Sequence, residues 1–127
     1  MKNKKPIPYI PAPGDVVWLD FSPSSGREIQ KRRPALVLSD FKFNQHTGFA
    51  FFAPITNTQR GHAFELVLAE SSEQDSEKNK NKTKGIALLH QVKSLDYRER
   101  QAELIEKIPE GLLNQALETL RCVFGAL

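Results

Sequence analysis

Cysteine is scarce in this sequence, where Cys122 stands alone beside three scattered histidines, His46, His62 and His90. One cysteine cannot form a disulfide within the chain, and its solitary state is typical of proteins from the cytosol. The histidines and the cysteine also lack the short spacings from which zinc sites are built. The sequence therefore predicts neither a disulfide-stabilised fold nor a metal site, and we expect no cofactor.

Long hydrophobic runs and familiar catalytic motifs are missing too. No apolar stretch approaches the roughly 18 residues that span a bilayer, and the N-terminal segment MKNKKPIPYIPAP lacks the apolar part of a secretory signal. Because prolines favour extended backbone, residues 1–13 are expected to form an extended basic arm. GxSxG, Walker and HExxH patterns do not occur. We therefore expect a cytoplasmic protein that does not enter a membrane.

The chain has enough residues for one globular domain and an excess of positive charge. It has 127 residues, 39% hydrophobic and 26% charged, which predicts a single domain over residues 1–127. The net charge of +3 and the sequence pI near 9.1 weakly favour an anionic partner. Its cations gather in two segments, residues 27–33 (REIQKRR) and 93–100 (KSLDYRER). These segments are the first candidates for contact with phosphates.

Short β-prone stretches bounded by turn residues predict a series of strands. They are residues 15–21 (DVVWLDF), 34–39 (PALVLS), 49–55 (FAFFAPI) and 63–69 (AFELVLA), followed by 85–96 (GIALLHQVKSLD), read as one or two strands that change direction near residues 90–93, and by 101–108 (QAELIEKI). Residues 41–48 (FKFNQHTG) contain polar breaks and a glycine, and they are interpreted as a connection between strands.

The two remaining segments differ from these strands. Residues 109–124 place leucines at helical spacing, and Pro109 stands where a first helical residue needs no backbone N–H. Residues 71–84 (SSEQDSEKNKNKTK) contain no apolar side chain and therefore predict a mobile polar loop. Many short strands followed by one amphipathic helix predict a mainly β fold with α, either a small β-barrel or an α+β domain.

Arg33 is the cation with the most defined backbone. Pro34 disfavours α-helical geometry in the residue before it, so Arg33 is expected at the extended start of a strand. An arginine held there can grip a phosphate with two parallel N–H groups. The alternative is structural, with Arg33 pairing with a carboxylate such as Asp15, Asp20 or Glu28.

Two further polar segments carry possible ligand contacts. In PITNTQRGH, residues 54–62, Thr56 and its polar neighbours supply donors and acceptors for a base edge or a phosphate. In HQVKSLDYRER, residues 90–100, rings stand beside cations, a combination that suits single-stranded nucleic acid. The alternatives are an ordinary exposed loop for the first segment, and a core tyrosine on a charged strand edge for the second.

The order of these motifs resembles the MazF/PemK family of type II toxin endoribonucleases, in particular its MazF and ChpB members. The stretches that carry the resemblance are GDVVWLDFSPSSGREIQKRRPALVLS, FNQHTG, APIT with RGHAFELVL, and GIALLHQVKSLDYRER, which run from about Gly14 to about Arg100. The resemblance implies a compact SH3-like antiparallel β-barrel with a C-terminal amphipathic helix, acting as a homodimer. It also implies an mRNA interferase that cleaves single-stranded RNA at short sequence motifs without a metal.

The implied reaction is attack of the RNA's own 2′-hydroxyl on the adjacent phosphorus, which leaves a 2′,3′-cyclic phosphate and a 5′-hydroxyl. Arg33 matches the family's RP arginine, implied to stabilise the transition-state charge and, less plausibly for so weak an acid, to protonate the leaving oxygen. Thr56 matches the threonine of the PxT motif, implied to orient the reacting groups. Glu28 matches a loop glutamate, the candidate general base.

His90 is a departure from the family pattern, because many relatives carry an aspartate there and some are thought to use it as the base. Histidine titrates near neutral pH, so the general base is left between Glu28 and His90, and His90 is alternatively a ring on which RNA stacks. The other residues implied in RNA binding are Arg27, Lys31, Arg32, Asn44, Gln59, Arg60, His62, Gln91 and Lys93.

The resemblance also implies a protein partner. A cognate antitoxin is expected to cover the basic groove with an acidic and apolar tail, and DNA is expected to be bound only through that antitoxin. Two other readings are kept open: a catalytically silent barrel that binds RNA or an acidic protein, and a gyrase-targeting toxin on the same fold.

Overall fold

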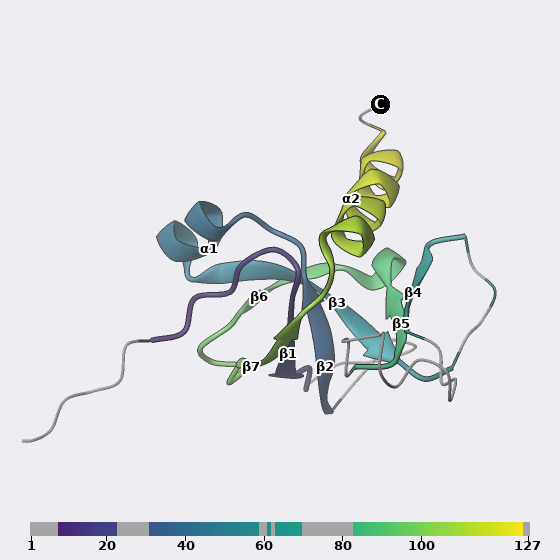
Figure 1. Cartoon of the computed structure of the whole chain (residues 1–127). Helices are drawn as coiled ribbons and strands as arrows, with labels where there is room; N and C mark the ends of the chain where they lie inside the picture. The colour runs from purple at the N-terminus through teal and green to yellow at the C-terminus, as the bar shows by residue number, and fades with distance from the viewer. Residues whose placement is uncertain (1–7, 23–30, 59–60, 62, 70–82, 126–127) are drawn as a thin grey trace, which may run out of the picture.

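The computed structural model describes residues 8–22, 31–58, 61, 63–69 and 83–125. Within these ranges the strands form one seven-stranded antiparallel sheet in the order β4-β5-β3-β2-β1-β7, with β6 paired to β3 as well (Figure 1). The strands are β1 Asp15–Asp20, β2 Arg32–Val37, β3 Phe49–Thr56, β4 Glu65–Ala69, β5 Gly85–Leu88, β6 Lys93–Asp96 and β7 Glu103–Lys107. The helices are α1 Phe41–Thr47, the 3₁₀ turn η2 Leu89–Gln91 and α2 Glu110–Phe124.

β3 is the central strand of the sheet, and it bends the sheet by sharing its length between three partners. Residues 52–54 of β3 pair with β2 on one side, whereas residues 49–52 pair with β6 and residues 55–56 with β5 on the other. The sheet therefore curls into a half-barrel, which confirms the predicted mainly β fold with a C-terminal helix.

The two faces of the sheet carry separate apolar cores, because successive strand residues point to opposite faces. On β1, Val16 joins the core that Ala116 and Leu120 of α2 cover, and Val17 joins a second core on the other face. The second core is centred on Phe52 and lies away from α2. Figure 1 shows α2 in yellow on one side of the sheet only. Part of the other face is therefore left for polar side chains.

Residues 41–47 form helix α1, whereas residues 41–48 were predicted to be a connection between strands. The Asp40 side chain accepts a hydrogen bond from the Lys42 N–H at 2.9 Å and so caps the start of α1. Gly48 ends the helix with a left-handed backbone, φ +77°, and its N–H donates to the Asn44 carbonyl. The capping residues were present in the sequence, but the polar side chains between them obscured the helix.

Asn44 is fully buried and serves the fold. Its side-chain amide donates to the Pro11 carbonyl at 2.8 Å and to the Ser39 carbonyl at 3.1 Å, and its side-chain oxygen accepts from the Ser39 hydroxyl. The hydroxyl of Tyr97 donates to the Asn44 carbonyl at 2.7 Å. The predicted RNA contact at Asn44 is corrected by this burial, because its amide already joins α1 to the N-terminal arm and to the end of β2.

The described part of the N-terminal arm, residues 8–13, packs against the sheet. The Tyr9 hydroxyl and the Ala12 N–H both donate to the buried Asp15 carboxylate, and the Lys107 ammonium lies 2.8 Å from it. Burial raises the pKa of the Tyr9 phenol well above its usual value, and the hydrogen bond to Asp15 raises it further. Residues 1–7 of the predicted arm lie outside the described residues.

The other predicted elements are found with small shifts. Residues 85–96, expected to form one or two strands, form two that are separated by η2, which confirms the change of direction near His90. β2 begins at Arg32, two residues earlier than predicted, and α2 begins at Glu110, so that Pro109 is its N-cap and not its first residue. Most of the predicted mobile loop, residues 71–82, lies outside the described residues. Among the helices in the described ranges, none has both the length and the apolar character needed to cross a membrane.

Candidate functional site

Strand register places Arg33 and Thr56 on the same face of the sheet. Ala35 of β2 pairs with Pro54 of β3. The neighbouring residues Leu36 and Ala53 are buried in the core on the α2 face. Ala35 and Pro54 therefore belong to the opposite face, as do Arg33 and Thr56, which lie two residues further along their strands. Continuing the same antiparallel register by two residues brings Arg33 across from Thr56. Both side chains are half-buried. The two sequence motifs that contain them, RP and PIT, therefore meet in space.

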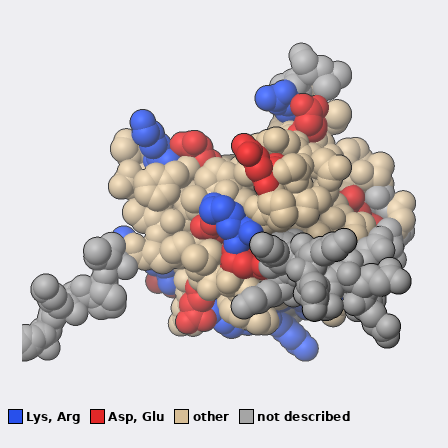
Figure 2. Space-filling model, in the orientation of Figure 1, with Lys and Arg blue, Asp and Glu red and all other residues tan. Residues whose placement is uncertain are grey.

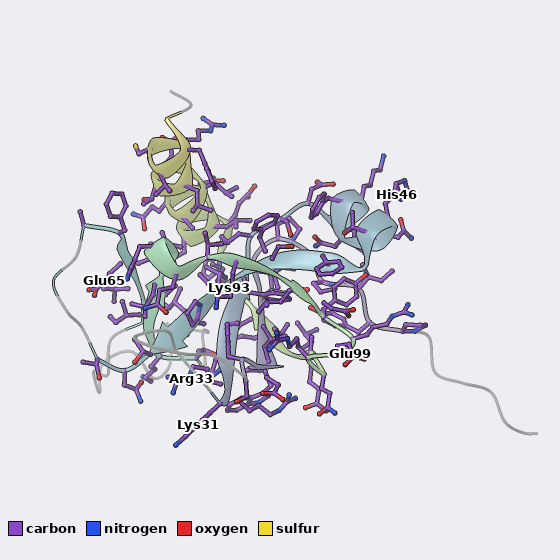
Figure 3. All side chains as sticks on the ribbon, turned by 180° about the vertical axis from the view of Figure 1, so that it is seen from behind. Lys31, Arg33, His46, Glu65, Lys93 and Glu99 are labelled. Atoms are coloured by element: carbon purple, nitrogen blue, oxygen red, sulfur yellow. The ribbon has the colours of Figure 1, made fainter. Side chains whose placement is uncertain are left out.

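Lys93 and Glu65 extend this face on the neighbouring strands. Lys93 of β6 pairs with Phe52 of β3, which belongs to the core on the Arg33 side. Glu65 of β4 alternates with the buried Leu66 of the opposite core, so its carboxylate points to the same side as Thr56. Figure 3, which views the molecule from behind, shows Lys93 and Arg33 near the middle of the sheet and Glu65 toward its β4 edge. We call this side of the sheet, opposite α2, the open face, and Arg33, Thr56, Lys93 and Glu65 the open-face cluster.

Glu65 was missed by the reasoning from sequence. Its strand was predicted, and the alternation in AFELVLA was recognised. Which of the two alternating faces stays open is decided by where α2 packs, and only the structure shows that. The Glu65 carboxylate accepts a hydrogen bond from the Gly61 N–H at 3.2 Å, so it also contacts the segment that follows β3.

His90 and Gln91 lie in η2, between the two strands that flank the ends of β3. Leu89 anchors this turn because its side chain is buried and its N–H donates to the Phe64 carbonyl at 3.0 Å. His90 is exposed and Gln91 is half-buried. Both residues therefore lie on an anchored turn that connects the strands of the open face.

Lys31 precedes β2 with an unusual backbone, φ +74°, which few residues other than glycine adopt. Its N–H donates to the Ser22 hydroxyl at 3.2 Å, and its carbonyl accepts from the Phe21 N–H at 3.1 Å. These bonds join the end of β1 to the start of β2. The Lys31 side chain is exposed, and Figure 3 shows it extending away from the body of the molecule.

Arg32 lies on the opposite side of β2 from Arg33. It pairs with Asp20 of β1 in the strand register, and its guanidinium donates to the Gln101 carbonyl at 2.8 Å and to the Glu103 carboxylate at 2.9 Å. Its predicted partner RNA would have to compete with these contacts. One of the carboxylates suggested as a structural partner of Arg33 is Asp15. Its carboxylate is bound instead by Tyr9, Ala12 and Lys107.

Five of the predicted site residues lie outside the described residues, namely Arg27, Glu28, Gln59, Arg60 and His62. Ser22 and Lys31 border the segment that contains Arg27 and Glu28, Thr58 and Gly61 border Gln59 and Arg60, and His62 stands alone after Gly61. Through Lys31 the first segment leads directly into Arg33, and through Thr58 the second follows directly from Thr56.

Charge is mixed over the molecule. On the side seen in Figure 2, lysines and arginines stand beside carboxylates and do not merge into one basic surface. The open-face cluster itself contains two cations, one carboxylate and one hydroxyl. Within the described ranges there is no group of three or more His, Cys, Asp or Glu side chains placed to hold a metal ion.

Comparison with known proteins gives a consistent result. Residues 12–124 match the model of the PemK-like, MazF-like toxins of type II toxin–antitoxin systems. The endoribonuclease toxin MazF of Escherichia coli is 42% identical over 94 residues, 74% of this chain and 76% of the relative. The endoribonuclease toxin ChpB of Escherichia coli is 37% identical over 114 residues, 87% of this chain and 90% of the relative.

Solved structures agree with the sequence comparison. The crystal structure of MazF from Deinococcus radiodurans superposes with a TM-score of 0.80 at 34% identity, covering 93% of this chain and 99% of that one. The same protein in a MazE-MazF structure gives a TM-score of 0.75 at 31% identity, covering 94% and 100%. The resemblance predicted from the motif order is thereby confirmed.

Proposed function

Because the chain belongs to the family of PemK-like, MazF-like toxins of type II toxin–antitoxin systems, and so is an endoribonuclease toxin, we propose that it cleaves single-stranded RNA on its open face. The observation that carries this proposal is the register of β2 and β3, in which Ala35 pairs with Pro54 and the continuation of both strands places Arg33 and Thr56 on the same face. Both residues stand on rigid strands, which hold catalytic groups more accurately than loops do.

The proposed reaction needs three services from the protein. A base removes the proton of the 2′-hydroxyl, whose oxygen then bonds to phosphorus while the bond from phosphorus to the 5′-oxygen breaks. Arg33 stabilises the negative charge that gathers on the phosphoryl oxygens. The departing 5′-oxygen takes up a proton and becomes a hydroxyl. The products are a 2′,3′-cyclic phosphate and a 5′-hydroxyl, and no water is consumed in this step.

Thr56 is proposed to orient the scissile phosphate or the 2′-hydroxyl. Its side-chain oxygen already accepts a hydrogen bond from the Thr58 N–H at 3.3 Å, which fixes the direction in which the hydroxyl is presented. A hydroxyl that both accepts and donates can then contribute its proton to a phosphate oxygen. Thr56 therefore supplies geometry, whereas Arg33 supplies charge.

The general base is proposed to be Glu28 or His90, and the two candidates differ in their place in the fold. His90 lies on the anchored turn η2, whereas Glu28 belongs to the segment that leads into Lys31 and β2. Loss of a general base lowers the rate at saturating RNA by about 10²–10⁴. Glu28→Gln and His90→Asn should therefore be compared in single-turnover reactions. If one of these variants keeps the full rate, the residue that it replaces is not the general base.

The remaining cations are proposed to bind the RNA backbone. Lys31 and Lys93 lie on either side of Arg33 along the open face, and Gln91 adds an amide from η2 (Figure 3). Arg27, Gln59, Arg60 and His62 are proposed to complete this surface. Single-stranded RNA fits such a surface because its phosphates and unstacked bases are both accessible.

The protein partner is a cognate antitoxin, as the solved MazE-MazF structures of relatives indicate. We propose that an acidic tail of this antitoxin covers Lys31, Arg33 and Lys93 in competition with RNA. DNA would be bound only through the antitoxin, and the toxin would act in the cytoplasm. Charge complementarity supports this mode of inhibition, since the described cations of the open face attract carboxylates as well as phosphates.

A homodimer is also part of the proposal. Leu38, Phe51, Val92, Leu120 and Phe124 line an apolar hollow of about 210 Å³ between the sheet and the end of α2. Phe124 is 69% exposed, and exposed apolar surface of this kind marks interaction sites. A second copy packed there would cover these side chains. Light scattering of Phe124→Asp and of the unchanged protein measures whether this face supports association.

One experiment tests the enzymatic function. Purified protein is incubated in EDTA with a mixture of single-stranded RNAs, and the product ends are mapped. We expect cyclic-phosphate ends that disappear with Arg33→Ala and persist with Arg121→Ala, an exposed arginine on α2. Bound but intact RNA would favour the silent binding barrel, and inhibition of gyrase without RNA cleavage would favour the gyrase-targeting alternative.

A further inference from the structure

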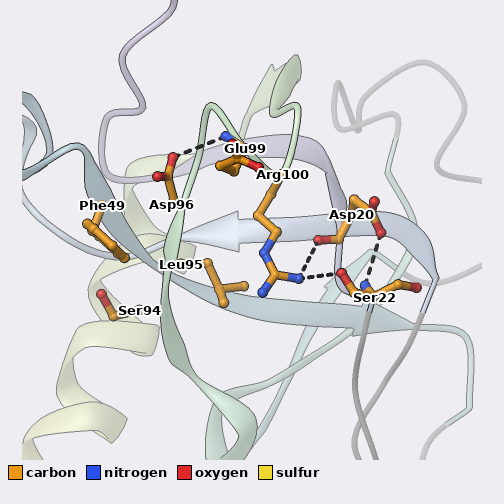
Figure 4. A pocket seen from close by; sticks show the side chains of 8 residues that line it. All are labelled: Asp20, Ser22, Phe49, Ser94, Leu95, Asp96, Glu99 and Arg100. Carbon is orange, nitrogen blue, oxygen red and sulfur yellow. Dashed lines mark hydrogen bonds between the residues drawn. The ribbon is translucent and has the colours of Figure 1, made fainter.

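Arg100 fastens the end of β1 to the turn between β6 and β7. Its guanidinium donates to the Ser22 carbonyl at 2.6 Å and to the Asp20 carbonyl at 3.2 Å, and its own carbonyl accepts from the Asp20 N–H at 3.0 Å (Figure 4). The turn that carries Arg100 is itself braced, because the Asp96 carboxylate accepts from the Arg98 and Glu99 N–H groups.

Arg32 makes the reciprocal connection from the start of β2 to the same turn. Its guanidinium reaches the Gln101 carbonyl at 2.8 Å, the Glu103 carboxylate at 2.9 Å and, more loosely, the Arg100 carbonyl at 3.5 Å. One arginine therefore runs from the turn to the end of β1, and the other runs from β2 back to the turn. We call Arg32 and Arg100 the clamp pair.

The strand ends that the clamp pair holds include the neck formed by Phe21, Ser22 and Lys31. The Lys31 N–H donates to the Ser22 hydroxyl, and the Phe21 N–H donates to the Lys31 carbonyl. Arg100 binds the carbonyl of Ser22, and Arg32 is the residue directly after Lys31. The left-handed backbone of Lys31 therefore persists between two fixed points.

We propose that Arg32 and Arg100 are positioning residues that hold the start of β2 so that Lys31 and Arg33 face the RNA on the opposite side. This inference rests on the proposed function of the open face. Arg32 and Arg33 are consecutive strand residues, so a movement that frees the Arg32 guanidinium also rotates Arg33. In a reaction that depends on the placement of one cation, such a rotation lowers the rate without removing any group that touches RNA.

The surroundings of Arg100 argue against a direct phosphate contact. The hollow beside it, about 500 Å³ in volume, is also lined by Asp20, Asp96 and Glu99 (Figure 4). These carboxylates repel a phosphate, while the arginine is already occupied by two carbonyls. The guanidinium of Arg32 is similarly directed at a carboxylate and carbonyls within the protein. Both members of the clamp pair therefore have protein partners in place of RNA.

The test compares Arg32→Gln and Arg100→Gln with the unchanged protein in steady-state RNA cleavage at several salt concentrations. We expect kcat to fall by about 10- to 100-fold, with KM changed less than about twofold. The slope of log KM against log salt should stay the same, because no phosphate contact is lost. Arg121→Gln removes the same charge from an exposed position on α2 and serves as the matched control. We expect its kcat and KM to be unchanged.

Hydrogen exchange supplies a readout that does not depend on cleavage. The amides of Phe21 and Lys31 should exchange at least about tenfold faster in both clamp variants, because their bonds lose a fixed neighbour. Arg121→Gln should leave them unchanged. If the unchanged protein cleaves no RNA, the proposed function fails, while these exchange rates still decide whether the clamp pair holds the neck.

Lysine variants keep the proposal testable if the glutamine variants fail to fold. Arg32→Lys and Arg100→Lys retain the charge but cannot donate to two acceptors from one planar group, so a smaller loss of kcat with an unchanged salt slope is expected. Two outcomes overturn the proposal. One is a kcat equal to that of the unchanged protein in every clamp variant. The other is a raised KM with a salt slope reduced by about one, which is the signature of a lost phosphate contact.

Discussion

Arg32 and Arg33 are neighbours in the chain, yet they serve opposite sides of strand β2. Arg32 turns toward Gln101 and Glu103 and connects strand ends, whereas Arg33 lies on the open face with Thr56. The two residues have the same charge and nearly the same chain neighbours. Position in the pleat, and not local charge density, therefore decides which arginine of the KRRP stretch shares a face with Thr56.

The largest effect is expected at Arg33. Arg33→Ala should lower kcat by about 10²–10³, because one preorganised donor to the developing charge is removed. Arg33→Lys should recover part of this loss, since a single ammonium replaces a planar group with two parallel donors. Steady-state rates at saturating RNA measure both. Equal rates for Arg33→Ala and the unchanged protein would remove Arg33 from the mechanism.

Thr56→Val should lower kcat by about tenfold, because a hydroxyl that orients the reacting groups is replaced by a methyl of similar shape. Thr58→Val is the matched control, since it removes a hydroxyl two residues further along the chain, beyond the end of β3. The same steady-state assay applies. If both variants lose rate to the same extent, the orienting role belongs to the segment as a whole and not to Thr56.

A smaller effect is expected at Lys93, which is proposed to contact the RNA backbone. Lys93→Gln should raise KM a few-fold and reduce the slope of log KM against log salt by about one, while kcat changes little. Lys107→Gln is unsuitable as its control because Lys107 pairs with the buried Asp15. Arg121→Gln supplies the charge-matched control, and a flat salt response of the unchanged protein would contradict the backbone-contact role of Lys93.

The smallest effect is expected at Glu65, the carboxylate of the open-face cluster. Glu65→Gln removes a charge that repels phosphate, so KM should fall by about twofold at low salt and converge with that of the unchanged protein as salt rises. Titrations at two salt concentrations measure this difference. An increase in KM would mean that Glu65 supports the surface through its hydrogen bond to Gly61 instead.

Much of the fold was predictable because its signals are local. Alternating and continuous apolar runs identified the strands, helical spacing identified α2, and the motif order identified the family. Helix α1 was missed because its N-cap Asp40 and terminal Gly48 enclose a polar stretch of only seven residues. In so short a helix the apolar periodicity is too brief to be recognised.

The site was harder to predict than the fold, because side-chain partners come from distant parts of the chain. Asn44 was assigned to RNA from its place in a motif, but its amide is consumed by Pro11 and Ser39. Arg32 was grouped with its cationic neighbours, although its partners lie about seventy residues further along the chain. Pairings of this kind depend on tertiary structure and leave no local trace in the sequence.

The comparison between the two arginines is tested most directly by measuring single-turnover cleavage and Lys31 amide exchange together in Arg32→Gln and Arg33→Gln. We expect both variants to cleave RNA more slowly, and the Lys31 amide to exchange faster only in Arg32→Gln. A slow Arg33→Gln variant with unchanged exchange would identify Arg33 as the group that acts on RNA. Faster exchange in Arg33→Gln, together with full cleavage by Arg32→Gln, would show that the two arginines do not have these separate roles.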